Sequence, residues 1–171
     1  MSSPFRIRPA SVRDAADLLA IYRPFVEETT VSFEIEVPGL AEFEQRIDTA
    51  LRGWGWLVAE VDGRPVGYAY GSSHRARDAY RYSVETSAYV REDHRRRGMA
   101  RALYTQLFTA LGDRGFASAY AGVAMPNEAS IGFHRGLGFR PIGVFPRVGR
   151  KFGAWHDVAW LYRPLGDEAG P

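Results

Sequence analysis

The hydrophobic and polar positions of this chain follow two different periods, and together they predict an ordered series of strands and helices. Period-two alternation or a short apolar run predicts strands at residues 5–8, 56–61, 66–71, 82–90, 117–123, 139–148 and 156–162. Apolar residues three and four apart predict helices between Ser11 and Val26, over 41–51, from the arginines at 95–97 to Gly112, and over 127–137. This order predicts an α/β fold with helices on the faces of a mixed sheet.

Local signals add detail at three of these boundaries. Ser11, followed three residues later by Asp14, resembles a capping box at the start of the first helix. Pro24 has no amide hydrogen, so it is predicted to kink or end that helix. Asp62 and Gly63 predict a hairpin turn. We therefore expect the second and third strands to be neighbours in the sheet.

The composition is typical of a single globular domain. The 171 residues are 46% hydrophobic and 25% charged, which is enough for one core over residues 5–164, and 1–4 and 166–171 are expected to be flexible tails. No stretch approaches the roughly 18–20 apolar residues of a membrane span. The first residues lack a secretory signal, so we expect a cytoplasmic protein with no membrane partner. The absence of cysteine excludes disulfides and cysteine nucleophiles.

Basic residues gather at 94–97, although the net charge is only +2, which argues against a dedicated nucleic-acid-binding protein. They lie between the strand 82–90 and a helix that begins at or near Gly98. The first turn of a helix has free N–H groups and a positive dipole end, and Gly98 and Ala100 would let a phosphate approach the backbone. The pattern matches neither a Walker loop nor a three-glycine dinucleotide fingerprint. It indicates either a phosphate-binding loop or an arginine-rich, solvated helix start.

Two motifs in this chain resemble those of the GNAT superfamily of N-acetyltransferases. Arg95-x-x-Gly98-x-Ala100, after an alternating strand, resembles the acetyl-CoA pyrophosphate loop of that superfamily. Asn127-x-x-Ser130-x-x-x-His134-x-x-x-Gly138-Phe139 resembles its later motif, and these positions lie on one side of a helix.

A narrower resemblance covers nearly the whole chain. Segments 22–34, 80–90 and 149–157 are similar to phosphinothricin and methionine sulfoximine N-acetyltransferases. The resemblance implies a GNAT fold, with a twisted, mostly antiparallel sheet that is splayed at the cofactor site and flanked by helices. It also implies acetyl-CoA as co-substrate, a small-molecule amine as acceptor, and a homodimer.

The same resemblance implies which residues hold the cofactor. Backbone groups at the splayed end of the central strand, at Ala88, Tyr89 and Val90, are expected to bind the pantetheine arm and the thioester. The residues expected to hold the pyrophosphate are Arg95, Arg96, Arg97, Gly98, Met99, Ala100 and Arg101. Asn127 and Ser130 are expected to touch the cofactor arm, and Asn127 is equally suited to cap its helix.

Glu85 and His134 are the candidate catalytic residues. Acetyl transfer needs a neutral amine, so a base must remove a proton from the ammonium group. Glu85 lies on the polar face of its strand, which indicates either a function or a solvent-facing position, and the resemblance implies that it is the base. His134 occupies the place where many GNAT enzymes carry a tyrosine that protonates the thiolate. Its role stays open between acid, base and positioning group, and a lone helical histidine is often structural.

The resemblance also implies an acceptor pocket, formed by Phe33, Arg75, Arg77, Tyr80, Glu85, Thr86 and Ser87. Arginine suits a carboxylate, phosphinate or sulfoximine through paired hydrogen bonds, although Arg75 and Arg77 also fit an ordinary solvated loop. Lys151 and Phe152 are candidates for closing the pocket, across a dimer interface as in relatives.

Several alternatives remain at this point. The histidines show no metal-ligand spacing, so no metal is expected. The acceptor could instead be a polyamine, an aminoglycoside or a protein N-terminus. A non-catalytic acyl-CoA sensor is disfavoured because Glu85 and the whole loop are retained. A nucleic-acid-binding module using 94–97 is disfavoured because the chain lacks a recognisable helix-turn-helix or aromatic RNA-binding signature.

Overall fold

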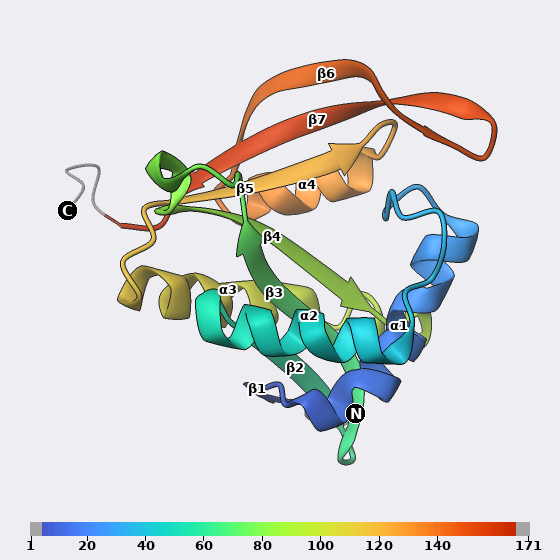
Figure 1. The fold of residues 1–171 in the computed structure, drawn as a ribbon, viewed down its shortest axis with the longest axis vertical. Helices are drawn as coiled ribbons and strands as arrows, with labels where there is room; N and C mark the ends of the chain where they lie inside the picture. The colour runs from blue at the N-terminus through green and yellow to red at the C-terminus, as the bar shows by residue number, and fades with distance from the viewer. Residues whose placement is uncertain (1–4, 167–171) are drawn as a thin grey trace.

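The computed structural model describes residues 5–166 and shows a sheet between two helical layers (Figure 1). The tails predicted to be flexible were 1–4 and 166–171. Of these residues only Gly166 lies within the described range. The strands are β1 Arg6–Pro9, β2 Trp56–Val61, β3 Arg64–Ser73, β4 Ser83–Val90, β5 Ser118–Ala124, β6 Arg140–Lys151 and β7 Ala154–Pro164. The helices are α1 Ala15–Glu28, α2 Leu40–Gly53, α3 Met99–Asp113 and α4 Glu128–Gly136, with short 3-10 turns at Val12–Asp14, Asp78–Tyr80 and Glu92–His94. The predicted order of strands and α-helices is confirmed.

The seven strands form one mixed sheet in the order β1-β2-β3-β4-β5-β7-β6, in which only β4 and β5 pair in parallel among the described strands. The β4–β5 ladder is short, because it joins Ser83–Glu85 to Ser118–Tyr120 and goes no further. Beyond Glu85 the two strands separate, so the splay that the resemblance implied is present. The backbone of β4 from Thr86 onward therefore has no strand partner on the β5 side.

Each face of the sheet has its own core. Helices α1 and α2 cover one face and pack on residues such as Val58 and Tyr68. Helices α3 and α4 cover the other face and pack on the next residue of each strand, Ala59 and Ala69. Because successive strand residues point to opposite faces, one alternating sequence supplies both cores.

Most predicted element boundaries shift by a few residues in the structure, for example in β3 and β7, and helix α1 and strand β6 extend further along the chain than predicted. Pro24 lies inside α1, which continues to Glu28. The buried residues Phe25 and Val26, which follow the proline, pack in the same core as Leu18 and Tyr22 before it, and this packing offsets the lost backbone hydrogen bond. Strand β6 continues to Lys151, three residues beyond the prediction, because it pairs with β7 up to a tight turn.

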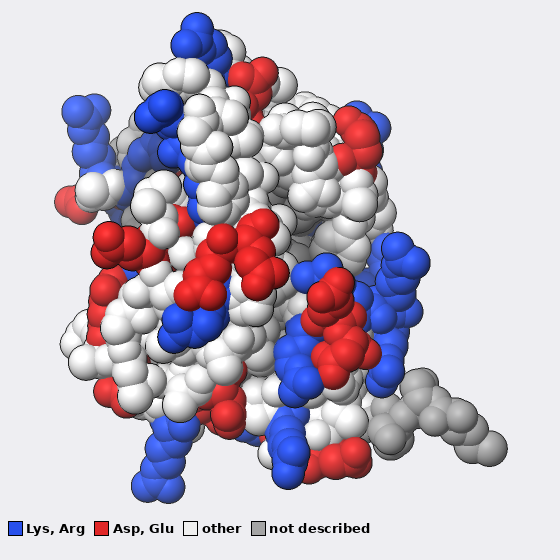
Figure 2. All heavy atoms as spheres, turned by 90° about the vertical axis from the view of Figure 1, so that its right-hand side faces the viewer, with Lys and Arg blue, Asp and Glu red and all other residues white. Residues whose placement is uncertain are grey.

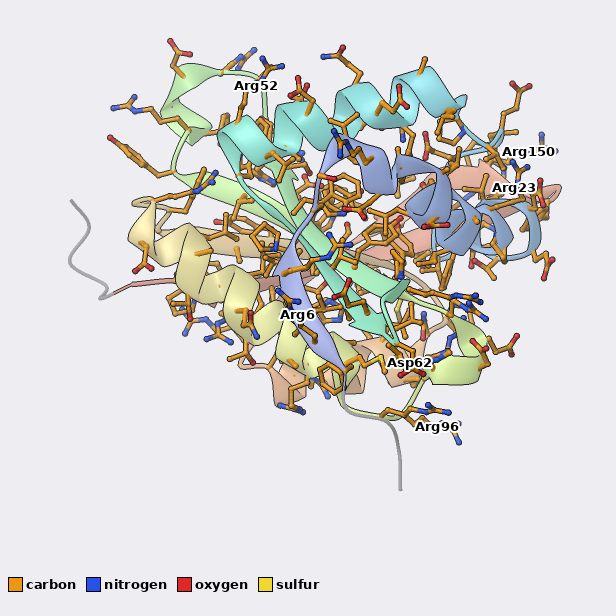
Figure 3. The ribbon with its side chains drawn as sticks, turned by 90° about the horizontal axis from the view of Figure 1, so that it is seen from below. Arg6, Arg23, Arg52, Asp62, Arg96 and Arg150 are labelled. Atoms are coloured by element: carbon orange, nitrogen blue, oxygen red, sulfur yellow. The ribbon has the colours of Figure 1, made fainter. Side chains whose placement is uncertain are left out.

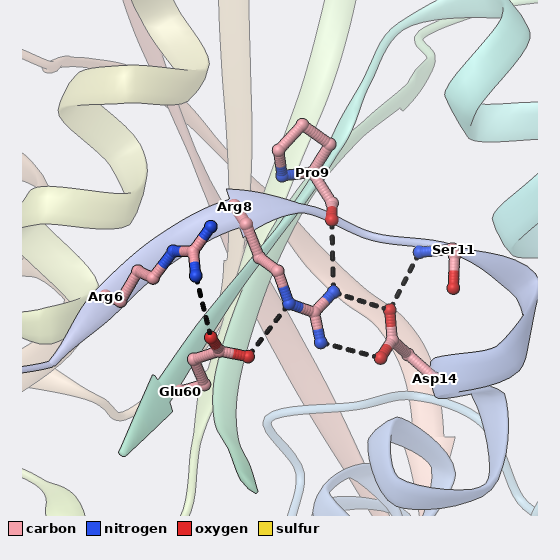
Figure 4. A network of polar contacts seen from close by, with 6 residues as sticks. All are labelled: Arg6, Arg8, Pro9, Ser11, Asp14 and Glu60. Atoms are coloured by element: carbon pink, nitrogen blue, oxygen red, sulfur yellow. Dashed lines mark hydrogen bonds and ion pairs between the residues drawn. The ribbon is translucent and has the colours of Figure 1, made fainter. Parts of the chain in front are cut away.

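An ionic network fixes the start of the chain to the sheet (Figure 4). Arg8 on β1 donates to both oxygens of Asp14, at 2.9 and 2.8 Å, and to Glu60 on β2 at 2.8 Å. Asp14 also accepts the Ser11 N–H at 2.8 Å, as the predicted capping box requires. Hydrogen bonds from Arg8 lower the pKa of Asp14, against a smaller opposing effect of partial burial. The network orients the chain as it enters α1.

The surface is charged but mixed. Figure 2 shows acidic and basic side chains interspersed on the face that carries α1 and the tip of the β6–β7 hairpin. Within residues 5–166, no helix has the length and apolar character needed to cross a membrane.

Candidate active site

The separation of β4 and β5 opens a narrow crevice through the sheet. It is lined by residues of β4, β5, α3 and α4, including Thr86, Tyr104, Asn127, Ser130 and His134, and also by Ala88 and Tyr89. The side chain of Thr86 is buried, and its hydroxyl has no hydrogen-bond partner among the described residues. A buried hydroxyl of this kind costs free energy unless a partner is supplied. The crevice therefore has an unpaired strand edge and an unpaired hydroxyl, which are the features that an extended polar ligand arm would satisfy.

His134 is buried beside this crevice, on α4. Its Nδ1 lies 2.8 Å from the carbonyl oxygen of Ser130, which can only accept, so Nδ1 carries the proton and Nε2 has the lone pair. Burial lowers the pKa of His134, against the weaker effect of the Ser130 backbone bond. The imidazole is therefore neutral near pH 7. Asn127 caps α4 by accepting the Ser130 N–H at 3.1 Å, so its capping role is confirmed.

Tyr104 is a crevice residue that the sequence pattern did not indicate. Its spacing in α3 marked it only as a core residue, yet it lines the crevice together with Thr86 and His134. Its ring meets that of His134 edge-on at 5.8 Å. Burial raises the pKa of Tyr104, so this phenol keeps its proton. Apolar periodicity cannot distinguish a tyrosine that packs in a core from one that lines a crevice at its edge.

The loop before α3 forms a second cavity, of about 350 Å³, next to Val90 at the end of β4. Gly98, the N-cap of α3, has φ of 79°, and nothing lies within 4 Å of the position a side chain would take. The residues of the predicted loop that line this cavity are Arg95, Arg96, Gly98, Met99, Ala100 and Arg101, with Val90 and Phe133. A helix N-terminus among arginines suits a pyrophosphate.

Not every arginine of the loop faces this cavity. Arg97 is not among its lining residues and donates to the carbonyl of Asp93 at 3.2 Å. Arg101 donates to the carbonyl of Gly136 at 2.9 Å and so links α3 to α4. Arg96 has φ of 60°, and Figure 3 shows it at the periphery of the molecule. Arg97 therefore has only a structural bond, whereas Arg95, Arg96 and Arg101 line the cavity.

A larger cavity of about 640 Å³ lies on the α1–α2 face. It shares several lining residues with the crevice, among them Thr86, Ser87, Tyr89 and Gly122, so the two spaces meet along β4. Glu85 lines only the larger cavity. The indole nitrogen of Trp160, also on its wall, is buried without a partner among the described residues.

Glu85 is half-buried at the floor of the larger cavity. Its Oε1 lies 3.0 Å from Nδ1 of His74 and 3.5 Å from Nη1 of Arg75. The carboxylate thus lines a cavity and is held by two neighbouring side chains, although its side chain is still 31% exposed.

The predicted acceptor residues divide into two groups. Phe33, Glu85, Thr86 and Ser87 line the larger cavity. The side chains of Arg75, Arg77 and Tyr80 do not line it. Nη1 of Arg75 lies 3.5 Å from Oε1 of Glu85, and the guanidinium of Arg75 lies over the ring of Trp160, at 5.9 Å. Arg77 and Tyr80 are exposed at the turn after β3.

The far wall of this cavity contains polar residues that the sequence did not point out. Arg46 on α2 donates to both oxygens of Glu34, at 3.0 and 2.6 Å. Glu34 also accepts a short hydrogen bond from Tyr22, whose hydroxyl lies 2.6 Å from that of Ser32. Burial opposes the ionisation of Glu34, but the bonds from Arg46 and Tyr22 outweigh it and lower the pKa. Arg46 lies twelve residues from Glu34, so no local signal could reveal the pair.

The connection between α1 and α2 rests on the β6–β7 hairpin. Lys151 is buried, and its ammonium donates to the carbonyl of Ser32 at 2.7 Å within the same chain. Burial lowers the pKa of Lys151, while Glu34 opposes the shift. Phe33 packs so closely on Gly149 that a Cβ there would lie 2.2 Å from the ring. Phe152 is exposed and lies over the Lys151 ammonium.

Within residues 5–166, no group of three or more His, Asp or Glu side chains is placed to hold a metal ion. The two joined cavities provide a narrow site and a larger site that meet at the carboxylate-bearing strand β4.

Comparison with known proteins gives the family. Residues 7–160 match the family model for the acetyltransferase (GNAT) domain, and the chain belongs to this family of N-acetyltransferases. It is 36% identical to phosphinothricin N-acetyltransferase of Streptomyces viridochromogenes, over 98% of this chain and 92% of that protein. It is 38% identical to the L-methionine sulfoximine/L-methionine sulfone acetyltransferase of Pseudomonas aeruginosa, over 91% of both. A putative acetyltransferase from Salmonella typhimurium, solved with acetyl-CoA, superimposes with a TM-score of 0.93 at 32% identity, over 99% of this chain and 98% of that one.

Proposed function

We propose that this chain transfers the acetyl group of acetyl-CoA to the amine of a small, amino-acid-like acceptor of the phosphinothricin, methionine sulfoximine or methionine sulfone type. The observation that carries the proposal is the meeting of the crevice and the larger cavity at Thr86 and Ser87, beside Glu85. Two substrates held in contact at that point could react directly, without a covalent enzyme intermediate. The relatives that act on such acceptors support the choice.

The residues present fit acetyl-CoA. The unpaired edge of β4 at Ala88, Tyr89 and Val90 and the hydroxyl of Thr86 would hold the pantetheine arm. The start of α3, with Arg95 and Arg96, would hold the pyrophosphate. When bound, acetyl-CoA supplies an acetyl thioester, so that the amine gains a C–N bond as the C–S bond breaks and CoA leaves as the thiol.

Glu85 is the proposed general base. It takes a proton from the ammonium group of the acceptor, so that the nitrogen lone pair becomes available. Its position on the wall of the larger cavity, next to the junction with the crevice, supports this role. A backbone N–H from the unpaired edge of β4 would stabilise the developing oxyanion.

His134 acts as a hydrogen-bond acceptor in this proposal rather than as the acid. The neutral ring donates from Nδ1 to Ser130, and only the lone pair of Nε2 is available for other groups. The lowered pKa of His134 keeps it in this form near neutrality. Tyr104, protonated and next to it, can donate a hydrogen bond to the departing sulfur, but its raised pKa makes it a poor acid, so it keeps its proton. The thiolate takes up the second proton that the attacking nitrogen releases as the amide forms.

The protein is also proposed to be a cytoplasmic homodimer of single domains. Large apolar side chains stand exposed along the β6–β7 hairpin, at the edge of the sheet, namely Ile142, Val144, Phe145, Val148, Phe152 and Trp155. An exposed apolar edge strand is a surface that proteins normally cover. Sedimentation of the wild type and of Val144→Lys tests this, with a dimer expected only for the wild type. A monomeric wild type would overturn it.

The activity is tested by following thiol release from acetyl-CoA. The acceptors are L-phosphinothricin, methionine sulfoximine, methionine sulfone, a polyamine and an aminoglycoside. Turnover restricted to the first three supports the proposal, whereas turnover of another amine keeps the chemistry and overturns the acceptor class. Binding of acetyl-CoA without turnover of any of them would contradict the proposed acceptor class and support the sensor alternative.

A further inference from the structure

His74 lies immediately after β3 and next to the proposed base on β4. The β3–β4 register pairs Ser72 with Glu85, so the end of β3 brings His74 to the carboxylate. Its Nδ1 lies 3.0 Å from Oε1 of Glu85, and the His74 side chain is 14% exposed. An ionised carboxylate can only accept hydrogen bonds, so Nδ1 is the donor.

The imidazole of His74 is held in one orientation by aromatic rings from three other elements. It stacks on Tyr120 of β5, with centroids 4.6 Å apart and planes 16° from parallel. Tyr80 and Trp160 meet it edge-on, at 5.9 and 6.1 Å. A ring packed in this way loses little further freedom when it donates a hydrogen bond, so its N–H is a fixed reference point for the carboxylate.

The two oxygens of Glu85 differ in their surroundings. Oε1 accepts from both His74 and Arg75. Among residues 5–166, no donor lies within hydrogen-bond distance of Oε2. Glu85 lines the larger cavity, whereas His74 and Arg75 do not. Oε1 is thus held by residues outside the cavity, and Oε2 is available to a ligand.

We propose that His74 is a positioning residue that anchors Oε1 of Glu85 and so leaves Oε2 to accept the proton of the acceptor ammonium. The inference rests on the proposed function, in which Glu85 is the base. In the step, an N–H bond of the ammonium breaks, an O–H bond forms at Oε2, and His74 keeps both its proton and its bond to Oε1. Fixing the carboxylate near its reactive orientation removes a rotation that would otherwise slow the transfer.

Two variants separate the hydrogen bond from the ring. His74→Phe keeps a flat ring on Tyr120 but removes the donor. His74→Asn removes the ring but places an amide N–H near the position of Nδ1. Both are compared with the wild type and with Glu85→Gln by kcat, by the KM values of acceptor and acetyl-CoA, by the pH profile of kcat/KM, and by thermal melting.

We expect His74→Phe to lower kcat by about 10-fold or more, since small misplacements of a reacting group are costly, with the KM for acetyl-CoA unchanged. The melting temperature of His74→Phe should stay near that of the wild type, because the ring can still stack on Tyr120. His74→Asn should recover most of the activity.

Three results would overturn the inference. If His74→Phe behaves as the wild type while Glu85→Gln is inactive, the base stands but does not need His74. If His74→Asn is as impaired as His74→Phe, an N–H at this position does not restore activity, and anchoring of Oε1 by a hydrogen bond is not the role of His74. If Glu85→Gln is fully active, the proposed base fails, and the role of His74 fails with it.

Discussion

The crevice side of the site and the larger cavity are built in different ways. The loop cavity comes mainly from one strand–loop–helix segment, 90–101, and the crevice comes from β4, β5, α3 and α4. The walls of the larger cavity come from α1, the α1–α2 connection, α2, β4 and the β6–β7 hairpin. The first site depends on local backbone geometry, and the second depends on how distant segments pack.

The polar groups of the two sites also differ. The crevice offers an unpaired strand edge, a helix N-terminus and a buried hydroxyl, with little charge inside it. The larger cavity contains the ion pair of Arg46 with Glu34 and the carboxylate of Glu85. Backbone groups suit a ligand that is always the same, whereas charged side chains set which acceptor is admitted.

The largest effect is expected where the two sites meet. Glu85→Gln should lower kcat by about 100-fold or more, the range seen for loss of general-base catalysis. Acetyl-CoA affinity, measured by calorimetry, should stay as in the wild type, because Glu85 does not line the crevice or the loop. Weaker acetyl-CoA binding by this variant would show that the two sites are not separate.

A substitution in the loop should affect only the cofactor side. Gly98→Ala places a side chain at φ of 79°, a strain of about 1–2 kcal/mol, and should raise the KM for acetyl-CoA by about 10-fold by displacing the N–H groups at the start of α3. Gly115→Ala is the matched control, because Gly115 has φ of 87° and equally open surroundings at the other end of α3. Equal effects of Gly98→Ala and Gly115→Ala on the KM for acetyl-CoA would contradict the prediction.

A substitution in the hairpin should affect only the acceptor side. In Gly149→Ala, the new Cβ would lie 2.2 Å from a ring carbon of Phe33, so this exposed ring must move within the cavity wall. We expect the acceptor KM to rise by about 5- to 10-fold, or about 1–1.4 kcal/mol, with the KM for acetyl-CoA unchanged. Gly143→Ala, on the same strand with nothing within 4 Å of its Cβ position, should leave both KM values unchanged.

The smallest functional effect is expected outside both sites. Asp14→Asn weakens the bonds to Arg8 and Ser11 and should lower the free energy of unfolding at pH 7 by about 1–2 kcal/mol, with kcat unchanged. The pKa of Asp14 is lowered in the folded state, so its contribution is complete above the unfolded pKa. It is lost as the pH falls through the lower folded value.

The difference in the free energy of unfolding between the wild type and Asp14→Asn should therefore shrink in acid, as urea titrations at several pH values would show. Asp48→Asn, at an exposed ion pair on α2, serves as the control and should change stability by less than about 1 kcal/mol. A gap between wild type and Asp14→Asn that persists at pH 2 would contradict the assignment.

The features that could be predicted from the sequence are the local ones, and those that could not depend on packing between distant segments. The order of strands and helices, the loop at Gly98 and the cap at Asn127 could be predicted, because each is encoded within a few neighbouring residues. Pro24 does not end α1, which was one of the two predicted outcomes, because tertiary packing outweighed a local rule. Tyr104 and Arg46 were missed because their neighbours in sequence make one look like core and the other like surface.

The sequence alone determined the local geometry of this protein: its alternating strands, its amphipathic helices and the strand–loop–helix segment for which we propose anion binding. These depend on backbone periodicity and on interactions within one or two turns. Only the tertiary structure decided that Arg46 pairs with Glu34, that Phe33 rests on Gly149, and that His74 holds one oxygen of Glu85. Such contacts depend on how strands and helices pack in three dimensions, and the short-range pattern of side chains does not record them.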